Sequence, residues 1–581
     1  MNHLEQSMLK TFRPLIEGLY GADESEKLLE RLQAVIGRYP ANRTVGSNPQ
    51  ARWNEKDALL ITYGDMVQNF FDPPLKTLRG FITDHLGQAL NTVHILPFFP
   101  YSSDDGFAVI DYRHVDPAVG TWEDVTRLSE DVYLAMDLVL NHVSRESNWY
   151  RDYTSGILPQ RNYFIEVPHG TDLSTVVRPR NRPLLLKTHT REGMRQIWTT
   201  FSEDQIDVDF GNPDVLFEFL DILLMYVEKG ARIIRLDAIA YLWKKIGTPC
   251  IHLPEVHMIV KLMRRTLEAV GSNALLLTET NVPHSENISY FGDGDEAHMV
   301  YQFTLPPLLL HALSKGTSKH LTAWAKTVSS APAGCTYLNF TASHDGIGVR
   351  PLEGLIPQGE LDALCEGVKE RGGYVSTKQN SDGSESPYEL NITYFDALAD
   401  ATKPEDKSHI DRFLCSQAIP LALKGIPAVY FNSLIGARND RKGVAKTGRF
   451  RSINRQKWNI GLLQQWLGEP SSREATIFTR YRRLLKVRGQ HPAFHPDGAQ
   501  TVLDLGSKVF GVLRTAPDKS EAIMAISNIS AVPATVSLRR WCRNPHRSYG
   551  DLISSQDLPN DEGRITLSPY QSVWTPIDTP D

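Results

Sequence analysis

Short apolar runs that stop abruptly at polar residues recur along the chain from about residue 57. Uninterrupted apolar runs of about four to eight residues are typical of strands that are buried on both faces, as a parallel sheet requires. Amphipathic stretches of helical length, such as residues 215–228 and 255–270, lie between these runs. The expected strands are residues 58–63, 93–99, 132–140, 231–236, 274–277, 300–303, 337–340 and 428–431.

This alternation of strand and helix predicts an α/β protein built on a (β/α)₈ TIM barrel. Parallel strands of such a barrel all end at one face, so polar residues that directly follow several strands are expected to meet there in one site. Two stretches, residues 144–205 and 346–410, interrupt the alternation. Loops of this length are usually functional or form small subdomains, so we predict two insertions in the barrel.

The remaining segments complete the expected organisation. Residues 1–56 carry a helical pattern, and the short alternating strands after about residue 500 predict a C-terminal antiparallel β-domain over residues 496–581. Residues 144–205 form insertion domain B, and residues 346–410 form the second insertion. We expect the barrel itself to occupy residues 57–143, 206–345 and 411–495.

Composition and charge restrict the class of protein without indicating a function. The chain of 581 residues has 62 Lys and Arg against 68 Asp and Glu, a net charge of −6, and 41% apolar residues. These are globular proportions, and the mildly acidic balance argues against nucleic acid or an anionic membrane as partner. Five scattered cysteines show no metal-ligand spacing, and the start lacks the basic and apolar regions of a signal peptide. We expect a cytoplasmic protein with free buried thiols.

Charged residues close two of the expected strands. Arg235 and Asp237 flank Leu236, so both point to the same side of their strand. A carboxylate held ionised by a neighbouring guanidinium suits a nucleophile, although an isolated pair of this kind is more often structural. Glu279 follows the next strand. A raised pKa there would suit a general acid, and a charge at a helix N-terminus is the alternative.

Two further strands end in chemistry-bearing residues. Asp137 lies inside its strand, where a paired buried carboxylate is the favoured interpretation, whereas His142 lies beyond the strand end and suits a ligand contact. His344 and Asp345 follow a later strand. Carboxylates, histidines and an arginine at one barrel face favour sugar chemistry. Retaining cleavage of a glycosidic bond needs a nucleophilic carboxylate and an acid/base carboxylate about 5–5.5 Å apart.

Four short motifs in this order resemble those of the α-amylase superfamily of retaining glycoside enzymes. They are DLVLNH at 137–142, RLDA at 235–238, the strand-end Glu279 and ASHD at 342–345. The resemblance implies that Asp237 is the nucleophile, Glu279 the general acid/base and Asp345 the stabiliser of the transition state. It implies that the residues around the transferred glucose include Arg235, His142 and His344.

Other segments resemble the sucrose-phosphorylase-like branch of this superfamily, glycoside hydrolase family 13. In SSDDGFAVIDY at 102–112, Asp105 matches the residue that holds the far hydroxyls of the glucose, and Arg451 in FRSINR matches an arginine at the closed end. Arg180 in RPR suits bidentate binding of phosphate or a carboxylate. The second insertion then carries loops of the acceptor site. The further acceptor-side candidates are Lys378, Tyr241, Tyr388 and Glu389.

Residues 278–303 and SPYELNITY at 386–394 look most like glucosylglycerate phosphorylases. Glu389 stands where sucrose phosphorylases usually carry Gln, whereas Tyr241 is typical of those sucrose enzymes. The resemblance therefore implies reversible phosphorolysis of 2-O-α-D-glucosyl-D-glycerate to α-D-glucose 1-phosphate and D-glycerate. Phosphorolysis of sucrose, sucrose 6′-phosphate or glucosylglycerol is the alternative, then hydrolysis or transglucosylation. A non-catalytic carbohydrate-binding barrel would have lost the carboxylates.

The resemblance also sets the expected partners. They are small molecules, namely the glucoside, inorganic phosphate and glucose 1-phosphate. No metal and no organic cofactor is expected for this double displacement. A homodimer is the assembly that the resemblance allows.

Overall fold

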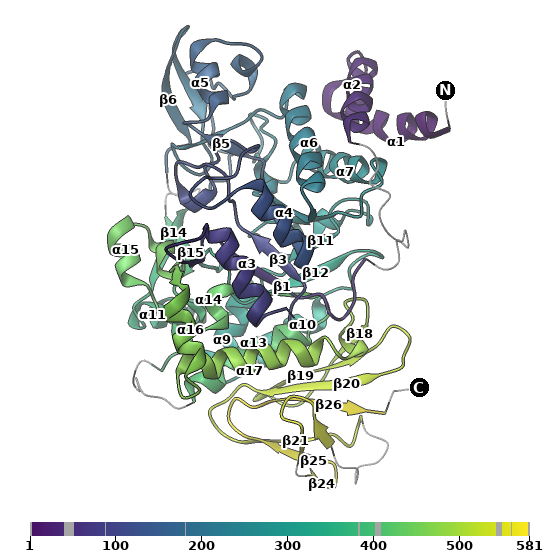
Figure 1. Cartoon of the computed structure of the whole chain (residues 1–581), viewed down its shortest axis with the longest axis vertical. Helices are drawn as coiled ribbons and strands as arrows, with labels where there is room; N and C mark the ends of the chain where they lie inside the picture. The colour runs from purple at the N-terminus through teal and green to yellow at the C-terminus, as the bar shows by residue number, and fades with distance from the viewer. Residues whose placement is uncertain are drawn as a thin grey trace.

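The computed structural model describes residues 3–39, 52–87, 89–179, 182–380, 384–400, 402, 408–541, 549–558 and 560–578 (Figure 1). Its centre is a closed barrel of eight parallel strands. Every strand overlaps one of the runs expected from the sequence, so the barrel prediction is confirmed. In chain order the strands are β1 (Leu59–Thr62), β3 (Thr92–Ile95), β4 (Tyr133–Val139), β9 (Ala231–Asp237), β10 (Leu275–Thr278), β11 (Met299–Tyr301), β12 (Thr336–Asn339) and β16 (Ile426–Tyr430).

Helices surround the barrel and explain why its strands lack polar alternation. Each residue of β1, β3, β10, β11, β12 and β16 is buried, because the inner face meets the barrel core and the outer face meets a helix. The larger surrounding helices are α3 (Pro74–His85), α4 (Trp122–Asp131), α6 (Pro213–Glu228), α7 (Pro254–Ala269), α9 (Leu305–Lys315), α10 (Lys319–Thr327), α13 (His409–Ala422), α16 (Ile460–Gly468) and α17 (Arg473–Arg488).

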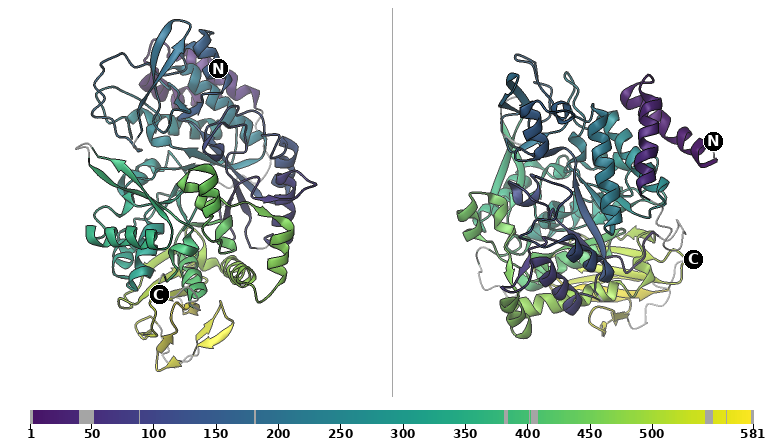
Figure 2. Two further views of the ribbon diagram at one scale, coloured as in Figure 1. Left: turned by 90° about the vertical axis from the view of Figure 1, so that its left-hand side faces the viewer. Right: turned by 45° about the horizontal axis from the view of Figure 1, so that its top comes forward.

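Both interruptions of the alternation follow the carboxyl end of a barrel strand. After β4 come β5 (His142–Ser144), α5 (Asn148–Ser155), the antiparallel pair β6 (Leu185–Thr190) and β7 (Gly193–Trp198), and β8 (Gln205–Asp207). After β12 come β13 (Ile347–Gly348), η5 (Arg350–Leu352), α11 (Gln358–Glu370), β14 (Tyr374–Gln379) and β15 (Glu385–Asn391). In Figure 2 the β14–β15 hairpin projects from the body of the molecule. Both segments thus lie on the face where the strands end.

Short elements fill the remaining connections. Near the carboxyl ends of the strands lie β2 (Val67–Gln68), η1 (Asp104–Gly106), η3 (Ile239–Tyr241), α8 (His284–Ile288), α12 (Tyr394–Ala397), α14 (Phe431–Leu434), α15 (Arg441–Thr447), η6 (Phe450–Asn454) and β17 (Trp458–Asn459). The other short 3₁₀ turns are η2 (Gln160–Asn162), η4 (Ser289–Phe291) and η7 (Pro492–Phe494).

The C-terminal segment is an antiparallel β-domain with its own apolar core, as predicted. Its main sheet is β18 (Ala499–Val502), β19 (Val509–Thr515), β20 (Ala522–Asn528) and β26 (Ser572–Ile577). Smaller pairings join β21 (Ala534–Ser537), β25 (Arg564–Leu567) and β24 (Asn560–Asp561), and β22 (Tyr549–Asp551) with β23 (Gln556–Leu558). Figure 1 shows this domain at the opposite end of the long axis from the N-terminal helices.

The N-terminal helices α1 (His3–Tyr20) and α2 (Ser25–Arg38) pack on the outside of the barrel against α7 and α6. The Tyr20 hydroxyl donates to the Phe210 carbonyl at 3.0 Å, and the Arg31 guanidinium lies 4.4 Å from the centre of the Phe217 ring. These contacts attach the segment firmly to the barrel. No helix in the described ranges has the length and apolar character of a membrane span.

Cysteines in the described part of the chain carry no disulfide. Cys250, Cys335, Cys365 and Cys415 are free and buried, and Cys542 lies outside the described residues. Burial raises the pKa of the Cys415 thiol to about 12. The thiol therefore stays protonated and packs as a small apolar group.

Arg488 ties the barrel to the segments around it. Its guanidinium is almost completely buried at the end of α17 and donates to five backbone carbonyls. Burial lowers the pKa of Arg488 to about 10, so the cation is retained at neutral pH. The accepting carbonyls belong to Leu421, Glu55, Asp57, Gly425 and Phe494.

Replacing Arg488 by Met is expected to lower the free energy of unfolding by about 3 kcal/mol or more, because several buried carbonyls lose their donor. Urea denaturation measures the change. The matched control is Arg480→Met on the same helix, where an exposed ion pair with Asp411 is removed and less than about 1 kcal/mol is expected. Equal losses in the two variants would contradict this interpretation.

Candidate active site

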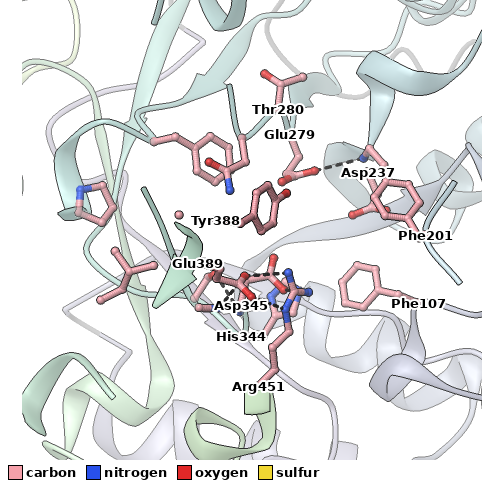
Figure 3. Close-up of a pocket in the computed structure, with 18 of the residues that line it drawn as sticks. Phe107, Phe201, Asp237, Glu279, Thr280, His344, Asp345, Tyr388, Glu389 and Arg451 are labelled. Atoms are coloured by element: carbon pink, nitrogen blue, oxygen red, sulfur yellow. Dashed lines mark hydrogen bonds and ion pairs between the residues drawn. The ribbon is translucent and has the colours of Figure 1, made fainter. Parts of the chain in front are cut away.

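The strand-end carboxylates meet in one pocket at the carboxyl ends of the barrel strands (Figure 3). Asp237 is the last residue of β9, Glu279 directly follows β10, and Asp345 lies a few residues beyond β12. All three line the pocket. The structure therefore brings together the three residues for which the sequence predicts catalytic roles.

Arg235 is the buried cation beneath this pocket. One of its nitrogens, Nη1, donates to Asp237 at 2.7 Å and also to Asp137. Asp137 is fully buried and accepts a further contact from His94, whose Nε2 lies 2.6 Å away. Although burial alone raises the pKa of Asp137, the charges of Arg235 and His94 hold it below its usual range. Asp137 is therefore a paired structural carboxylate, and Asp237 is the one that faces the pocket.

Glu279 is positioned by the turn that ends β9. Ala238, directly after Asp237, adopts a left-handed conformation with φ of +51°, and its N–H donates to Glu279 Oε2 at 3.2 Å. A left-handed turn at a residue with a side chain costs free energy, so the surrounding structure must hold it. The turn after Asp237 thus holds Glu279 through the backbone, and the dashed line from Glu279 in Figure 3 marks this contact.

Burial raises the pKa of both Glu279 and Asp237, and the charge of Glu279 further raises that of Asp237. Burial and mutual repulsion therefore both favour one proton in this pair. Arg235 Nη1 lies 2.7 Å from Asp237, whereas Nη2 lies 4.0 Å from Glu279. Because the closer guanidinium stabilises a negative charge on Asp237, this geometry favours the proton on Glu279. One ionised and one protonated carboxyl is the arrangement that a retaining double displacement requires.

Asp345 belongs to a second charged network, which contains Arg451 and Glu389. Arg451 contacts Asp345 through Nη1 and holds Glu389 in a fork, with Nε and Nη2 at 3.1 and 2.8 Å from its two oxygens. Glu389 also accepts from the Gly346 N–H at 3.1 Å. A Cβ at Gly346 would lie 2.5 Å from Glu389 Cγ, so this approach requires glycine. Despite its burial, the charge of Arg451 and its neighbours keeps the pKa of Asp345 far below its usual range.

Asp105 pairs with Arg455, an arginine for which the sequence pattern predicts no role. Arg455 Nη1 lies 2.5 Å from Asp105 Oδ2 and 3.6 Å from Asp104, and Arg455 Nε donates to the His344 carbonyl. Arg451, the arginine predicted for the closed end, lies in the same FRSINR motif, lines the pocket and contacts Asp345 and Glu389. The sequence signal for Arg455 is its position four residues after Arg451 in the same motif. Which of the two arginines contacts Asp105 depends on the course of η6, and the sequence does not show that course.

The two predicted glucose-side histidines both line the pocket. His142 Nε2 lies 2.9 Å from the Phe107 carbonyl, and the His344 ring stacks on the Phe107 ring with centroids 4.7 Å apart. Burial lowers the pKa of His142 to about 4 and that of His344 to about 3. Both imidazoles are therefore neutral at physiological pH and suited to hydrogen bonds with uncharged hydroxyls.

Only some of the predicted acceptor-side residues line the pocket. Tyr241, Tyr388 and Glu389 line the pocket. Lys378 lies on β14 outside the pocket lining, with Nζ 3.6 Å from Glu353. Arg180 lies outside the described residues, so its contact with phosphate stays a prediction. Among the described residues, no group of three or more His, Cys, Asp or Glu is arranged to hold a metal ion.

Known proteins with similar sequences and folds agree with this geometry. Residues 83–347 match the family model described as "Alpha amylase, catalytic domain". The chain is 44% identical to the glucosylglycerate phosphorylase of Spirochaeta thermophila over 97% of both chains. It is 40% identical to the glucosylglycerate phosphorylase of Escherichia coli over 98% of this chain and 100% of that one.

A solved structure is similar as well. The crystal structure of sucrose 6F-phosphate phosphorylase from Thermoanaerobacter thermosaccharolyticum aligns with a TM-score of 0.72 and 26% identity, covering 83% of this chain and 95% of that chain. By its site geometry and its similarity over nearly the whole length, the chain belongs to the α-amylase family, in the branch of the glucosylglycerate and sucrose phosphorylases.

Proposed function

We propose that this enzyme is a retaining glucoside phosphorylase that converts 2-O-α-D-glucosyl-D-glycerate and phosphate reversibly to α-D-glucose 1-phosphate and D-glycerate. The observation that carries the reaction class is the pair of buried carboxyls beside Arg235, with Asp237 2.7 Å from Nη1 and Glu279 4.0 Å from Nη2, in the pocket that Asp345 also lines. The identity of the acceptor is supported by relatives named glucosylglycerate phosphorylase, which are more similar to this chain than the sucrose 6F-phosphate enzyme. Its partners are small molecules, and a cytoplasmic location and a homodimer remain predictions.

The reaction begins when Asp237 attacks the anomeric carbon of the glucosyl unit. The bond from that carbon to the glycerate oxygen breaks, and Glu279 transfers its proton to the departing oxygen. A β-glucosyl ester of Asp237 results. A phosphate oxygen then attacks the same carbon, the ester bond breaks, and the Glu279 carboxylate accepts the proton of the incoming phosphate. Two inversions give net retention.

The remaining networks support this sequence of steps. In our proposal Asp345, kept ionised by Arg451, stabilises the positive charge that develops on the sugar ring. Asp105 and Arg455, together with the neutral His142 and His344, hold the glucose hydroxyls. Glu389 acts through Arg451, because its carboxylate is occupied by that guanidinium and by the Gly346 N–H.

The choice of acceptor is tested by phosphate release from α-D-glucose 1-phosphate. We expect D-glycerate to be preferred over fructose, fructose 6-phosphate and glycerol, and Asp237→Asn to lower the rate with D-glycerate by at least about 10⁴-fold. Thermal unfolding checks that the variant is folded. Preference for another acceptor would refute the proposed substrate, and substantial turnover by Asp237→Asn would remove it as the nucleophile.

The pH dependence tests the assignment of the proton to Glu279. Because this group must be protonated to release glycerate and its pKa is raised by burial, kcat/KM is expected to fall as the pH rises above that pKa. Glu279→Gln is expected to lower kcat/KM for the glucoside about 10³-fold and to abolish this alkaline decline. With α-D-glucosyl fluoride, whose leaving group needs no proton, the formation of the glucosyl-enzyme should change less than about tenfold. An unchanged alkaline decline in Glu279→Gln would contradict the assignment.

The role of Glu389 is tested by Glu389→Gln, which keeps the shape of the side chain and removes its charge. The loss of the charged fork to Arg451 is expected to lower kcat/KM about tenfold through a less fixed Asp345. Initial rates of phosphorolysis measure the effect. Glu385→Gln is the matched control, because Glu385 lies on the same strand but is exposed and accepts from Thr377. Equal rates for the two variants would show that Glu389 has no positioning role.

A further inference from the structure

Most described cations around the pocket already have carboxylate partners. This matters because the proposed acceptor and phosphate are both anions, and a cation that is already neutralised contributes little attraction to either. The paired cations are Arg235 with Asp137 and Asp237, Arg451 with Asp345 and Glu389, Arg455 with Asp104 and Asp105, Lys244 with Asp207, and Lys378 with Glu353.

Arg350 differs from these cations. In the described part of the chain no carboxylate oxygen lies within 4.0 Å of its guanidinium, and its Nε is buried without a hydrogen-bond partner. Arg235 and Arg455 also have one buried nitrogen without a partner, but carboxylates contact the rest of each guanidinium. Arg350 combines an unpartnered buried nitrogen with the lack of a carboxylate among the described residues, so its charge is available to a ligand. Arg350 is therefore a free positive charge close to the substrate pocket.

The position of Arg350 places this charge at the acceptor side. It opens η5, two residues beyond Gly348, which lines the pocket, and the N–H of the intervening Val349 donates to the Tyr388 carbonyl at 3.0 Å. Burial raises the pKa of the Tyr241 phenol, and the positive charge of Arg350 opposes that effect. Tyr241 and Tyr388 line the same pocket as Glu279, which serves the departing acceptor.

The side-chain amide of Asn281 lies on the same side of the pocket as Tyr241 and Tyr388. Asn281 lines the pocket, and its Oδ1 is buried without a hydrogen-bond partner. Its side chain packs directly over Gly348, where a Cβ would lie 2.3 Å from Asn281 Nδ2. Only a residue without a side chain at position 348 leaves room for the Asn281 amide, and position 348 is two residues before Arg350. Asn281 thus lines the pocket directly, and Arg350 lies behind the lining residue Gly348, close enough for its charge to act on Tyr241.

We propose that Arg350 binds the carboxylate of the acceptor, and that the Asn281 amide takes a hydroxyl of the same molecule. The ligand class is a short hydroxycarboxylic acid, which is D-glycerate if the proposed function holds. The inference rests on that function and adds the residue that distinguishes a charged acceptor from a neutral one. Lys378 suits this role less well, because it lies outside the pocket lining and its Nζ is 3.6 Å from the Glu353 carboxylate.

The experiment compares acceptors in the reverse reaction, with phosphate release from α-D-glucose 1-phosphate as the signal. For Arg350→Gln, kcat/KM for D-glycerate should fall about 10- to 100-fold, as expected for the loss of a charge-assisted contact. The value for glycerol, the neutral analogue, should change less than about threefold, and so should the hydrolysis of glucose 1-phosphate. The matched control Lys378→Gln should leave the ratio between the two acceptors unchanged.

Arg350→Lys gives a second measurement if Arg350→Gln folds poorly. It keeps the charge but not the fork, so an intermediate loss that is specific for D-glycerate is expected. Equal losses for D-glycerate and glycerol, or no loss for either, would overturn the role of Arg350 while leaving the proposed function intact. A wild-type enzyme that does not use D-glycerate would refute the proposed function itself, and with it this inference.

Discussion

Arg235 is the charge around which the pocket is organised. It lies on a barrel strand, nearly without exposure to solvent, and contacts two carboxylates with one nitrogen. A buried guanidinium without such partners would be very unfavourable, and so would two buried carboxylates without the guanidinium. The buried Asp137 offsets much of the desolvation cost of the guanidinium on the side away from the pocket. Asp237 is the partner of Arg235 that lines the pocket. The strand alternation of residues 235–237 makes this arrangement a direct result of the barrel fold.

The same principle of paired charges extends through the rest of the site. Glu279 lies beside Asp237 but farther from the guanidinium, so Arg235 favours the charged form of Asp237 more than that of Glu279 although both are buried. Arg451 contacts both Asp345 and Glu389, and Arg455 contacts both Asp104 and Asp105. The net charge of −6 therefore says little about ligands. The binding of an anion depends on which cations around the pocket lack a carboxylate partner.

Much of the fold was predictable because a parallel barrel leaves a simple pattern. Strands buried on both faces are uninterrupted apolar runs, and the strand ends mark the site, which is why the sequence alone predicts Asp237, Glu279 and Asp345 as site residues. The spacing of Arg235 and Asp237 also predicted their contact, since alternate residues of a strand share a side.

The contacts between loops were not predictable in this way. Arg451 and Arg455 share one motif, and only the course of η6 shows that Arg455 meets Asp105. Glu389 and Arg451 are 62 residues apart, and their fork depends on the close approach that Gly346 allows. Lys378 carries the right charge, but it lies outside the pocket lining and contacts Glu353. Sequence patterns identify strand ends, whereas these pairings follow from how the long insertions fold back on the barrel.

The central claim is that Asp237 forms the bond to the sugar while Glu279 serves the leaving group. The most direct measurement is peptide mapping by mass spectrometry after the enzyme reacts with 2-deoxy-2-fluoro-α-D-glucosyl fluoride, which slows the breakdown of a glucosyl ester. The account predicts one fluoroglucosyl group per chain, attached to the peptide that contains Asp237. A label on Glu279, Asp345 or another residue would contradict it.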